Sequence, residues 1–263
     1  KMDYDKMLRA HEQAGAACTI SVIQVSMDEA KRFGIMNVGP DGFINEFEEK
    51  PAHPKSDLAS MGIYIFDWKV LRKYLIEDEA DPNSDKDFGK NIIPKMLAAG
   101  EKLLPYRFEG YWRDVGTIVS LWDANMDMLS PTLINLYDPK WPIRAKSPIR
   151  PPHSIGRQAE AVHSIITEGC TIEGHVENSV LSNSVTVGAG ARVLYSILHP
   201  GVVVEPGAVV EYAILGEGTV VGAGAHVGAQ PDGTDDWCVA TVGPDVAVPA
   251  GATVPAGAMI YDG

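Results

Sequence analysis

A short unit, Val-x-x-Gly-Ala-x-Val, recurs in the C-terminal third of the sequence and constrains its fold more than any other feature. Copies begin at Val187, Val204 and Val221, an interval of 17 residues each time, and two more begin six residues apart at Val248 and Val254. A step of this length accommodates one short strand and one turn, in which glycine supplies backbone conformations that other residues avoid. Three steps make a coil of about 18 residues, and such a coil buries its apolar face only by stacking on another coil.

The repeat therefore predicts a parallel β-helix from about Ser164 onward. An antiparallel β-sandwich with glycine-rich turns is the alternative, but that fold does not require a fixed sequence period. The pattern resembles the hexapeptide-repeat family, and this resemblance implies a left-handed helix. Residues 229–242 interrupt the period, and we expect them to form a loop that leaves one coil.

Residues 1 to about 130 lack this period and read as alternating strands and helices. We expect strands at 19–25, 34–38, 42–47 and 61–66, and helices at 88–99 and 116–129. Such a mixture is typical of an α/β fold. The segment 136–152 contains five prolines, which predicts a stiff connector. We therefore expect an α/β domain at 1–135, a linker at 136–152 and a β-helix domain at 153–263.

Charge and cysteine content argue against several classes of function. The formal net charge of the 263-residue chain is −13, whereas a nucleic-acid surface needs clustered lysine and arginine. No apolar run approaches the roughly 20 residues that a membrane span requires, and we expect no signal peptide. Cys18, Cys170 and Cys238 are far apart, which favours free thiols in a reducing cytosol over a disulfide framework or a zinc site.

Three clusters in the first half carry groups suited to chemistry. Glu49 and Lys50 are consecutive strand residues that point to opposite faces, so lysine can meet a phosphate while the carboxylate accepts sugar hydroxyls. A solvated strand end is the alternative. Ser60 can donate to a ligand or merely satisfy the backbone. Asp114 precedes a predicted helix, where its carboxylate suits either Mg²⁺ or the helix N-terminus.

The order and spacing of these clusters resemble the bacterial glucose-1-phosphate adenylyltransferases, also called ADP-glucose pyrophosphorylases. The motifs are Arg32-Phe-Gly34, Phe47-Glu-Glu-Lys-Pro51, Ala59-Ser-Met-Gly-Ile-Tyr64, Asp87-Phe-Gly-Lys-Asn-Ile-Ile-Pro94 and Tyr111-Trp-Arg-Asp-Val-Gly-Thr117. The run 78–89 and the segment 136–141 favour the adenylyl branch. The resemblance implies a partial nucleotide-diphospho-sugar transferase domain of Rossmann-like α/β fold, followed by a left-handed parallel β-helix.

The resemblance also implies an activity, namely transfer of AMP from ATP to glucose 1-phosphate, with release of pyrophosphate and formation of ADP-glucose for glycogen synthesis. Carried over position by position, it implies that Gly34, Glu49, Lys50 and Ser60 contact glucose 1-phosphate. It implies that Asp114 holds Mg²⁺, so Lys50 and Asp114 are the candidate catalytic residues. A cytoplasmic location and a homotetramer are further implications.

Two family features have no counterpart in this sequence. Family members begin with a loop, Gly-Gly-x-Gly-x-Arg-Leu, that cradles the ATP phosphates, and they carry a second metal-binding aspartate shortly before the position equivalent to Lys1. We therefore expect this chain to be the C-terminal portion of such an enzyme and to be inactive by itself.

Other functions stay open at this point. The chain can be another sugar-1-phosphate nucleotidyltransferase, or a regulatory paralogue that kept the fold and lost activity. A β-helix acyltransferase would need a catalytic histidine, for which His175, His199 and His226 are candidates, although no acid partner is evident from sequence. A module that only drives assembly is the remaining alternative.

Overall fold

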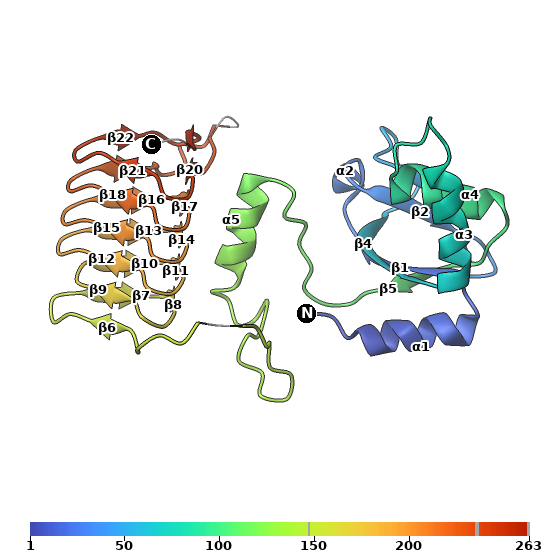
Figure 1. The fold of residues 1–263 in the computed structure, drawn as a ribbon, viewed down its shortest axis with the longest axis horizontal. Helices are drawn as coiled ribbons and strands as arrows, with labels where there is room; N and C mark the ends of the chain where they lie inside the picture. The colour runs from blue at the N-terminus through green and yellow to red at the C-terminus, as the bar shows by residue number, and fades with distance from the viewer. Residues whose placement is uncertain (147, 235–236, 262–263) are drawn as a thin grey trace. The chain divides into compact units, whose positions relative to one another are not determined.

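The computed structural model describes residues 1–146, 148–234 and 237–261 (Figure 1). The chain forms two compact units, Lys1–Trp112 and Arg113–Gly263. Residue 147 of the predicted linker, residues 235 and 236 of the predicted loop, and residues 262 and 263 of the predicted β-helix domain lie outside the described residues. Within the described part, no helix combines the length and apolar character needed to cross a membrane.

The first unit is built on a five-stranded mixed sheet with the strand order β3-β2-β4-β1-β5. Its strands are β1 (Cys18–Gln24), β2 (Gly34–Val38), β3 (Ile44–Glu49), β4 (Leu58–Phe66) and β5 (Leu103–Arg107). β1 pairs in parallel with β5 and antiparallel with β4, while β2 and β3 form an antiparallel hairpin. The first five residues of β1 are all buried, as expected of a strand covered on both faces. The α/β prediction for this half is confirmed.

Helices cover this sheet and complete its core. They are α1 (Tyr4–Ala14), α2 (Met27–Ala30), α3 (Trp68–Glu79), the π-helix η1 (Phe88–Ile92) and α4 (Ile93–Ala98). Ile20 of β1 is fully buried in one cluster with Tyr74 of α3 and Met96 of α4. The sequence prediction did not include α1, α3 or β5, and it gave 88–99 as one regular helix.

That last expectation was wrong in its first turn, which is a π-helix. Pro94 has no N–H, so it cannot form the α-helical hydrogen bond to the carbonyl oxygen of Lys90. The N–H of Ile93 instead donates to the carbonyl oxygen of Phe88, five residues earlier. Single π turns of this kind are frequent at functional sites.

The second unit contains the predicted parallel β-helix, which is confirmed as three six-stranded parallel sheets (Figure 1). One sheet contains β6 (Ser154–Ile155), β9 (Thr171–Ile172), β12 (Thr186–Val187), β15 (Val203–Val204), β18 (Val220–Val221) and β21 (Ala247–Val248). The next contains β7 (Glu160–Val162), β10 (His175–Glu177), β13 (Arg192–Leu194), β16 (Val209–Glu211), β19 (His226–Val227) and β22 (Thr253–Val254). The third contains β8 (Ile165–Ile166), β11 (Val180–Leu181), β14 (Ile197–Leu198), β17 (Ala213–Leu215), β20 (Ala240–Val242) and β23 (Met259–Ile260).

The register of these sheets follows the sequence period. Val187, Val204 and Val221 are partners in successive strands and are fully buried, so an interval of 17 residues is one coil. The first strand begins at Ser154, ten residues before Ser164 and in the same coil, because the first two coils lack the Gly-Ala motif by which the repeat was recognised. The predicted interruption after residue 229 is confirmed up to β20, which resumes the coil at Ala240.

The remaining helix, α5 (Ile118–Asp127), belongs to the second unit. Its apolar face packs against Ile197, Ile214 and Val239 of the β-helix. The indole Nε1 of Trp122 donates to the carbonyl oxygen of Tyr195 at 2.7 Å. The sequence interpretation had grouped this helix with the first half; the structure shows it packed on the β-helix. A family domain that ends at residue 135 stays a prediction.

Candidate functional site

Gly34 and Glu49 lie opposite each other in the β2–β3 hairpin. The backbone leaves little room around the Glu49 carboxylate. A Cβ atom at Gly34 would lie 3.0 Å from Glu49 Oε2, and a Cβ atom at Gly89 would lie 2.9 Å from the same oxygen. Glycine at both positions therefore allows the carboxylate to lie against the two backbones.

Lys50 follows β3 in an unusual backbone conformation, with a φ of 48°. Its N–H donates to the carbonyl oxygen of Phe33 at 3.0 Å, which fixes the turn. Its Nζ lies 4.0 Å from Glu49 Oε1, and its side chain is 67% exposed. A left-handed conformation is uncommon for residues other than glycine, and such strain gathers at functional sites. The exposure of the side chain is also consistent with the alternative of a solvated strand end.

Ser60 lies on β4 beside a β-bulge. The β1–β4 register shifts between Ile20 and Val22, and Gly62 has a φ of 69°. The Ser60 hydroxyl accepts a hydrogen bond from the N–H of Gly62 at 3.2 Å and also interacts with the phenol of Tyr64. The hydroxyl of Ser60 therefore satisfies a backbone N–H at the bulge. Because a hydroxyl can accept and donate at the same time, Ser60 can also donate to a ligand.

Tyr64, Asp87 and Phe88, which the sequence analysis did not single out, lie beside the predicted site residues. The Tyr64 ring stacks on Phe88 of η1, with ring centroids 5.8 Å apart and planes inclined at 19°. Burial raises the pKa of the Tyr64 phenol above its ordinary value, and the negative charges of Glu49 and Asp87 act in the same direction. Tyr64 is therefore a neutral hydroxyl donor at neutral pH. All three residues belong to the motifs named in the sequence analysis, but their residue types alone did not predict a role in a site.

The group as a whole suits a polyhydroxylated anion. Lys50 supplies a cation for a phosphate, while the carboxylates of Glu49 and Asp87 can accept hydrogen bonds from hydroxyl groups. Ser60 and Tyr64 add neutral hydroxyls, and Phe88 adds an apolar wall that is 37% exposed. The structure thus brings together Gly34, Glu49, Lys50 and Ser60 in the first unit.

Asp114 is the remaining predicted site residue, and it belongs to the second unit. The N-cap of α5 is Thr117, whose hydroxyl accepts the N–H of Ser120 at 3.1 Å. The helix cap is therefore supplied without the carboxylate of Asp114. No cluster of three or more histidine, cysteine or acidic side chains that could hold a metal ion occurs among the described residues.

The three candidate histidines of an acyltransferase lie on the β-helix. The expectation that they lack acid partners was wrong for two of them. The His175 nitrogens lie 3.1 Å from Glu160 and 3.2 Å from Glu177, and His226 Nε2 lies 2.7 Å from Glu211. Because carboxylates contact both ring nitrogens of His175, neither nitrogen is free to act as a general base. His199 is exposed, and nothing around it favours the acyltransferase hypothesis.

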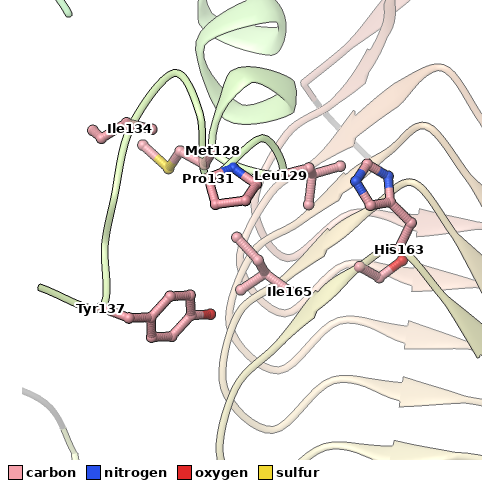
Figure 2. A pocket seen from close by; sticks show the side chains of 8 residues that line it. Met128, Leu129, Pro131, Ile134, Tyr137, His163 and Ile165 are labelled. Atoms are coloured by element: carbon pink, nitrogen blue, oxygen red, sulfur yellow. The ribbon is translucent and has the colours of Figure 1, made fainter.

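The second unit also contains a pocket of about 350 Å³ between the turn after α5 and the first coils (Figure 2). Met128, Leu129, Pro131, Ile134 and Ile165 make its lining mainly apolar. The polar members of the lining are Tyr137, His163 and Ser164. Because the lining contains no lysine, arginine or acidic side chain, this pocket does not match the chemistry of a sugar phosphate.

Comparison with known protein families gives two matched regions, and the first of them extends beyond α5, whereas the two structural units divide before that helix. Residues 1–131 match the family described as "Nucleotidyl transferase", and residues 151–248 match the family described as "GlmU-like, C-terminal hexapeptide". Residues 1–131 belong to the nucleotidyl transferase family. Glu49, Lys50 and the residues beside them lie in the region that matches the nucleotidyl transferase family. Most of the β-helix lies in the region that matches the hexapeptide family.

Curated proteins similar to this chain include several named glucose-1-phosphate adenylyltransferase. The protein of Clostridium perfringens (strain SM101 / Type A) is 59% identical over 201 residues, which cover 76% of this chain and 52% of the relative. That of Clostridioides difficile (strain 630) is 56% identical over 205 residues, 77% of this chain and 53% of the relative. That of Bacillus cereus (strain ATCC 10987 / NRS 248) is 52% identical over 202 residues, 76% of this chain and 54% of the relative.

The family resemblance inferred from the motifs is thereby confirmed. The chain spans about half the length of the curated relatives it matches.

Proposed function

We propose that this nucleotidyl transferase chain contributes the sugar-phosphate site of a glucose-1-phosphate adenylyltransferase. The reaction transfers AMP from ATP to glucose 1-phosphate, releases pyrophosphate and supplies ADP-glucose for glycogen synthesis. The observation that carries the proposal is the grouping of Glu49 and Lys50 around the left-handed turn at Lys50, with Gly34 and Ser60 beside them. The relatives that share the sequence carry the name of this activity.

Each residue of the group has a distinct role in this proposal. Lys50 binds the phosphate of glucose 1-phosphate and offsets its charge. Glu49 accepts hydrogen bonds from the sugar hydroxyls, and Ser60 with the neutral Tyr64 donates to sugar or phosphate oxygens. The bound phosphate oxygen then attacks the α-phosphate of ATP in line. The contribution of these residues is to hold the attacking oxygen in position and to neutralise charge as it develops.

The proposed metal is Mg²⁺, and Asp114 is the residue that would hold it. Mg²⁺ is commonly bound by one or two carboxylates together with substrate phosphates and water. A single carboxylate from the described residues therefore fits this ion better than a site formed by protein ligands alone. The bound ion would supply charge neutralisation on the ATP phosphates. A cytoplasmic location and a homotetramer belong to the same proposal, and light scattering tests the latter.

Calorimetric titration of the full 263-residue chain tests the proposed substrate. Glucose 1-phosphate should bind one site, while glucose 6-phosphate and inorganic phosphate should bind much more weakly. Tighter binding of N-acetylglucosamine 1-phosphate would instead favour a different sugar-1-phosphate nucleotidyltransferase. The absence of saturable glucose 1-phosphate binding would overturn the proposal. The expectation that this polypeptide is inactive alone is separate, and ADP-glucose formation in the same preparation would contradict it.

A further inference from the structure

The ammonium group of Lys86 closes the C-terminal end of α3. Its Nζ donates to the carbonyl oxygens of Asp78, of Glu79 at 3.0 Å and of Asp81 at 2.9 Å. These three contacts use all three donors of the ammonium group. The last carbonyls of a helix lack helical partners and favour a positive charge, so Lys86 satisfies the helix end and fixes its own loop to it.

A half-buried ion pair between Asp78 and Lys95 joins this end of α3 to α4. Asp78 is 4% exposed, and its Oδ1 accepts from Lys95 Nζ of α4 at 2.7 Å and from the Ser84 hydroxyl at 2.8 Å. The Ser84 hydroxyl oxygen in turn accepts the N–H of Lys86 at 3.0 Å. Ser84 and Lys86 are thus bound to the C-terminal end of α3, and Asp78 links that end to Lys95 of α4.

Lys86 is also the point at which the chain turns toward the proposed substrate site. Its φ of 58° directs the backbone into Asp87, whose Oδ1 accepts the N–H of Lys90 at 2.8 Å and begins η1. Together with Asp87, the next two residues form one wall of the site: Phe88 stacks on Tyr64, and Gly89 lies against Glu49. A change in the direction of the chain at Lys86 would therefore displace three consecutive residues of that wall.

We infer that Lys86 is a positioning residue for the sugar-phosphate site. It acts through Asp87, Phe88 and Gly89 and is placed by its contacts with α3. The inference rests on the proposed function for the identity of the ligand. The contact network itself does not depend on the ligand, so the order of the wall can be measured without it.

The test compares Lys86→Met with Lys69→Met, which removes an exposed lysine at the start of the same helix. Lys86→Met should raise the amide hydrogen exchange of residues 87–92 and weaken glucose 1-phosphate binding by about tenfold, since small misplacements of a site cost one to two orders of magnitude. Lys69→Met should change neither quantity. Lys86→Gly keeps the left-handed turn without strain but lacks the ammonium, and it should behave like Lys86→Met.

The outcomes separate this inference from the proposed function. If the unaltered chain binds glucose 1-phosphate and Lys86→Met binds it equally well with unchanged exchange at 87–92, the inference is wrong and the proposed function stands. If the unaltered chain does not bind, the proposed function fails, and a role for Lys86 in that site fails with it. Circular dichroism of each variant shows whether the fold is retained. Should Lys86→Met not fold, the comparison of Lys86→Gly with the unaltered chain decides the inference.

Discussion

The two units of this chain encode structure in different ways. In the β-helix, one set of contacts recurs in each coil, so Val187, Val204 and Val221 occupy the same environment and any one predicts the others. In the first unit, the groups suited to chemistry depend on features that occur once: the turn at Lys50, the bulge at Gly62 and the π turn of η1. A repeat predicts the fold of its unit, whereas the proposed site depends on irregular features that do not recur in this way.

The largest expected effect is on the stability of the repeat. Leu198 is fully buried in β14, so Leu198→Ala should lower the free energy of unfolding of the β-helix by about 2–5 kcal/mol. Denaturant unfolding monitored by circular dichroism measures it. Binding of glucose 1-phosphate should be unchanged, because the proposed site lies in the other unit. If binding were lost as well, ligand binding by the first unit would depend on the stability of the β-helix, and the contrast between the two units would fail.

The next largest effect is on the site rather than on stability. Lys50→Gln should weaken glucose 1-phosphate binding by about 100-fold, since a hydrogen bond to a charged group contributes roughly 1.5–3 kcal/mol. The unfolding of the β-helix should not change. Lys69→Gln is the matched control, because it removes an exposed cation outside the group. Equal affinity of the Lys50 and Lys69 variants would remove Lys50 from the site.

A smaller effect is expected where side chains rather than backbone link the coils. The Ser196 hydroxyl is buried; it accepts the N–H of Ala213 at 3.1 Å and donates to the carbonyl oxygen of Leu194 at 2.7 Å. Ser196→Ala should cost about 1–3 kcal/mol, because it leaves a buried donor without its partner. Ser182→Ala, at a half-buried serine in the same unit, should cost less. Equal costs would show that the hydroxyl contacts between coils add nothing.

The smallest effect concerns acid stability of the first unit. The pKa of Asp78 lies below its ordinary value, mainly because the carboxylate accepts a hydrogen bond from Lys95. A lowered folded-state pKa contributes stability above the ordinary value of about 4, and this contribution is lost as the pH falls through the folded-state pKa. Asp78→Asn should therefore flatten the dependence of Tm on pH below about 4. If Tm fell as steeply with decreasing pH in Asp78→Asn as in the unaltered chain, Asp78 would make no contribution to this pH dependence.

The same contrast explains what the sequence could predict. The register of the β-helix followed from the period. In the structure, Ser164, Ser179 and Ser196 form a ladder in which each hydroxyl accepts a backbone N–H of the next coil. Glu49 and Lys50 were identified from a motif, but the closeness of Gly89 to Glu49 arises from a contact between distant segments that no local pattern contains.

The unit against which a helix packs also could not be predicted from the local sequence pattern. The apolar spacing of residues 116–129 predicted α5 correctly, but an apolar stripe fits either unit. In the structure, Trp122 of α5 packs its ring against Tyr212 and donates a hydrogen bond to the carbonyl oxygen of Tyr195. The π turn of η1 likewise depended on Pro94, whose effect on the preceding residues is not part of a helical periodicity.

Nuclear magnetic resonance titration of the labelled chain with glucose 1-phosphate tests the central claim most directly. The account predicts saturable shifts of the amides at 33–35, 49–50, 60–64 and 87–90, with those of the β-helix unmoved and with the shifts lost in Lys50→Gln. Saturable shifts that spare these segments and gather on the β-helix, or shifts that persist in Lys50→Gln, would contradict a sugar-phosphate site at Glu49 and Lys50.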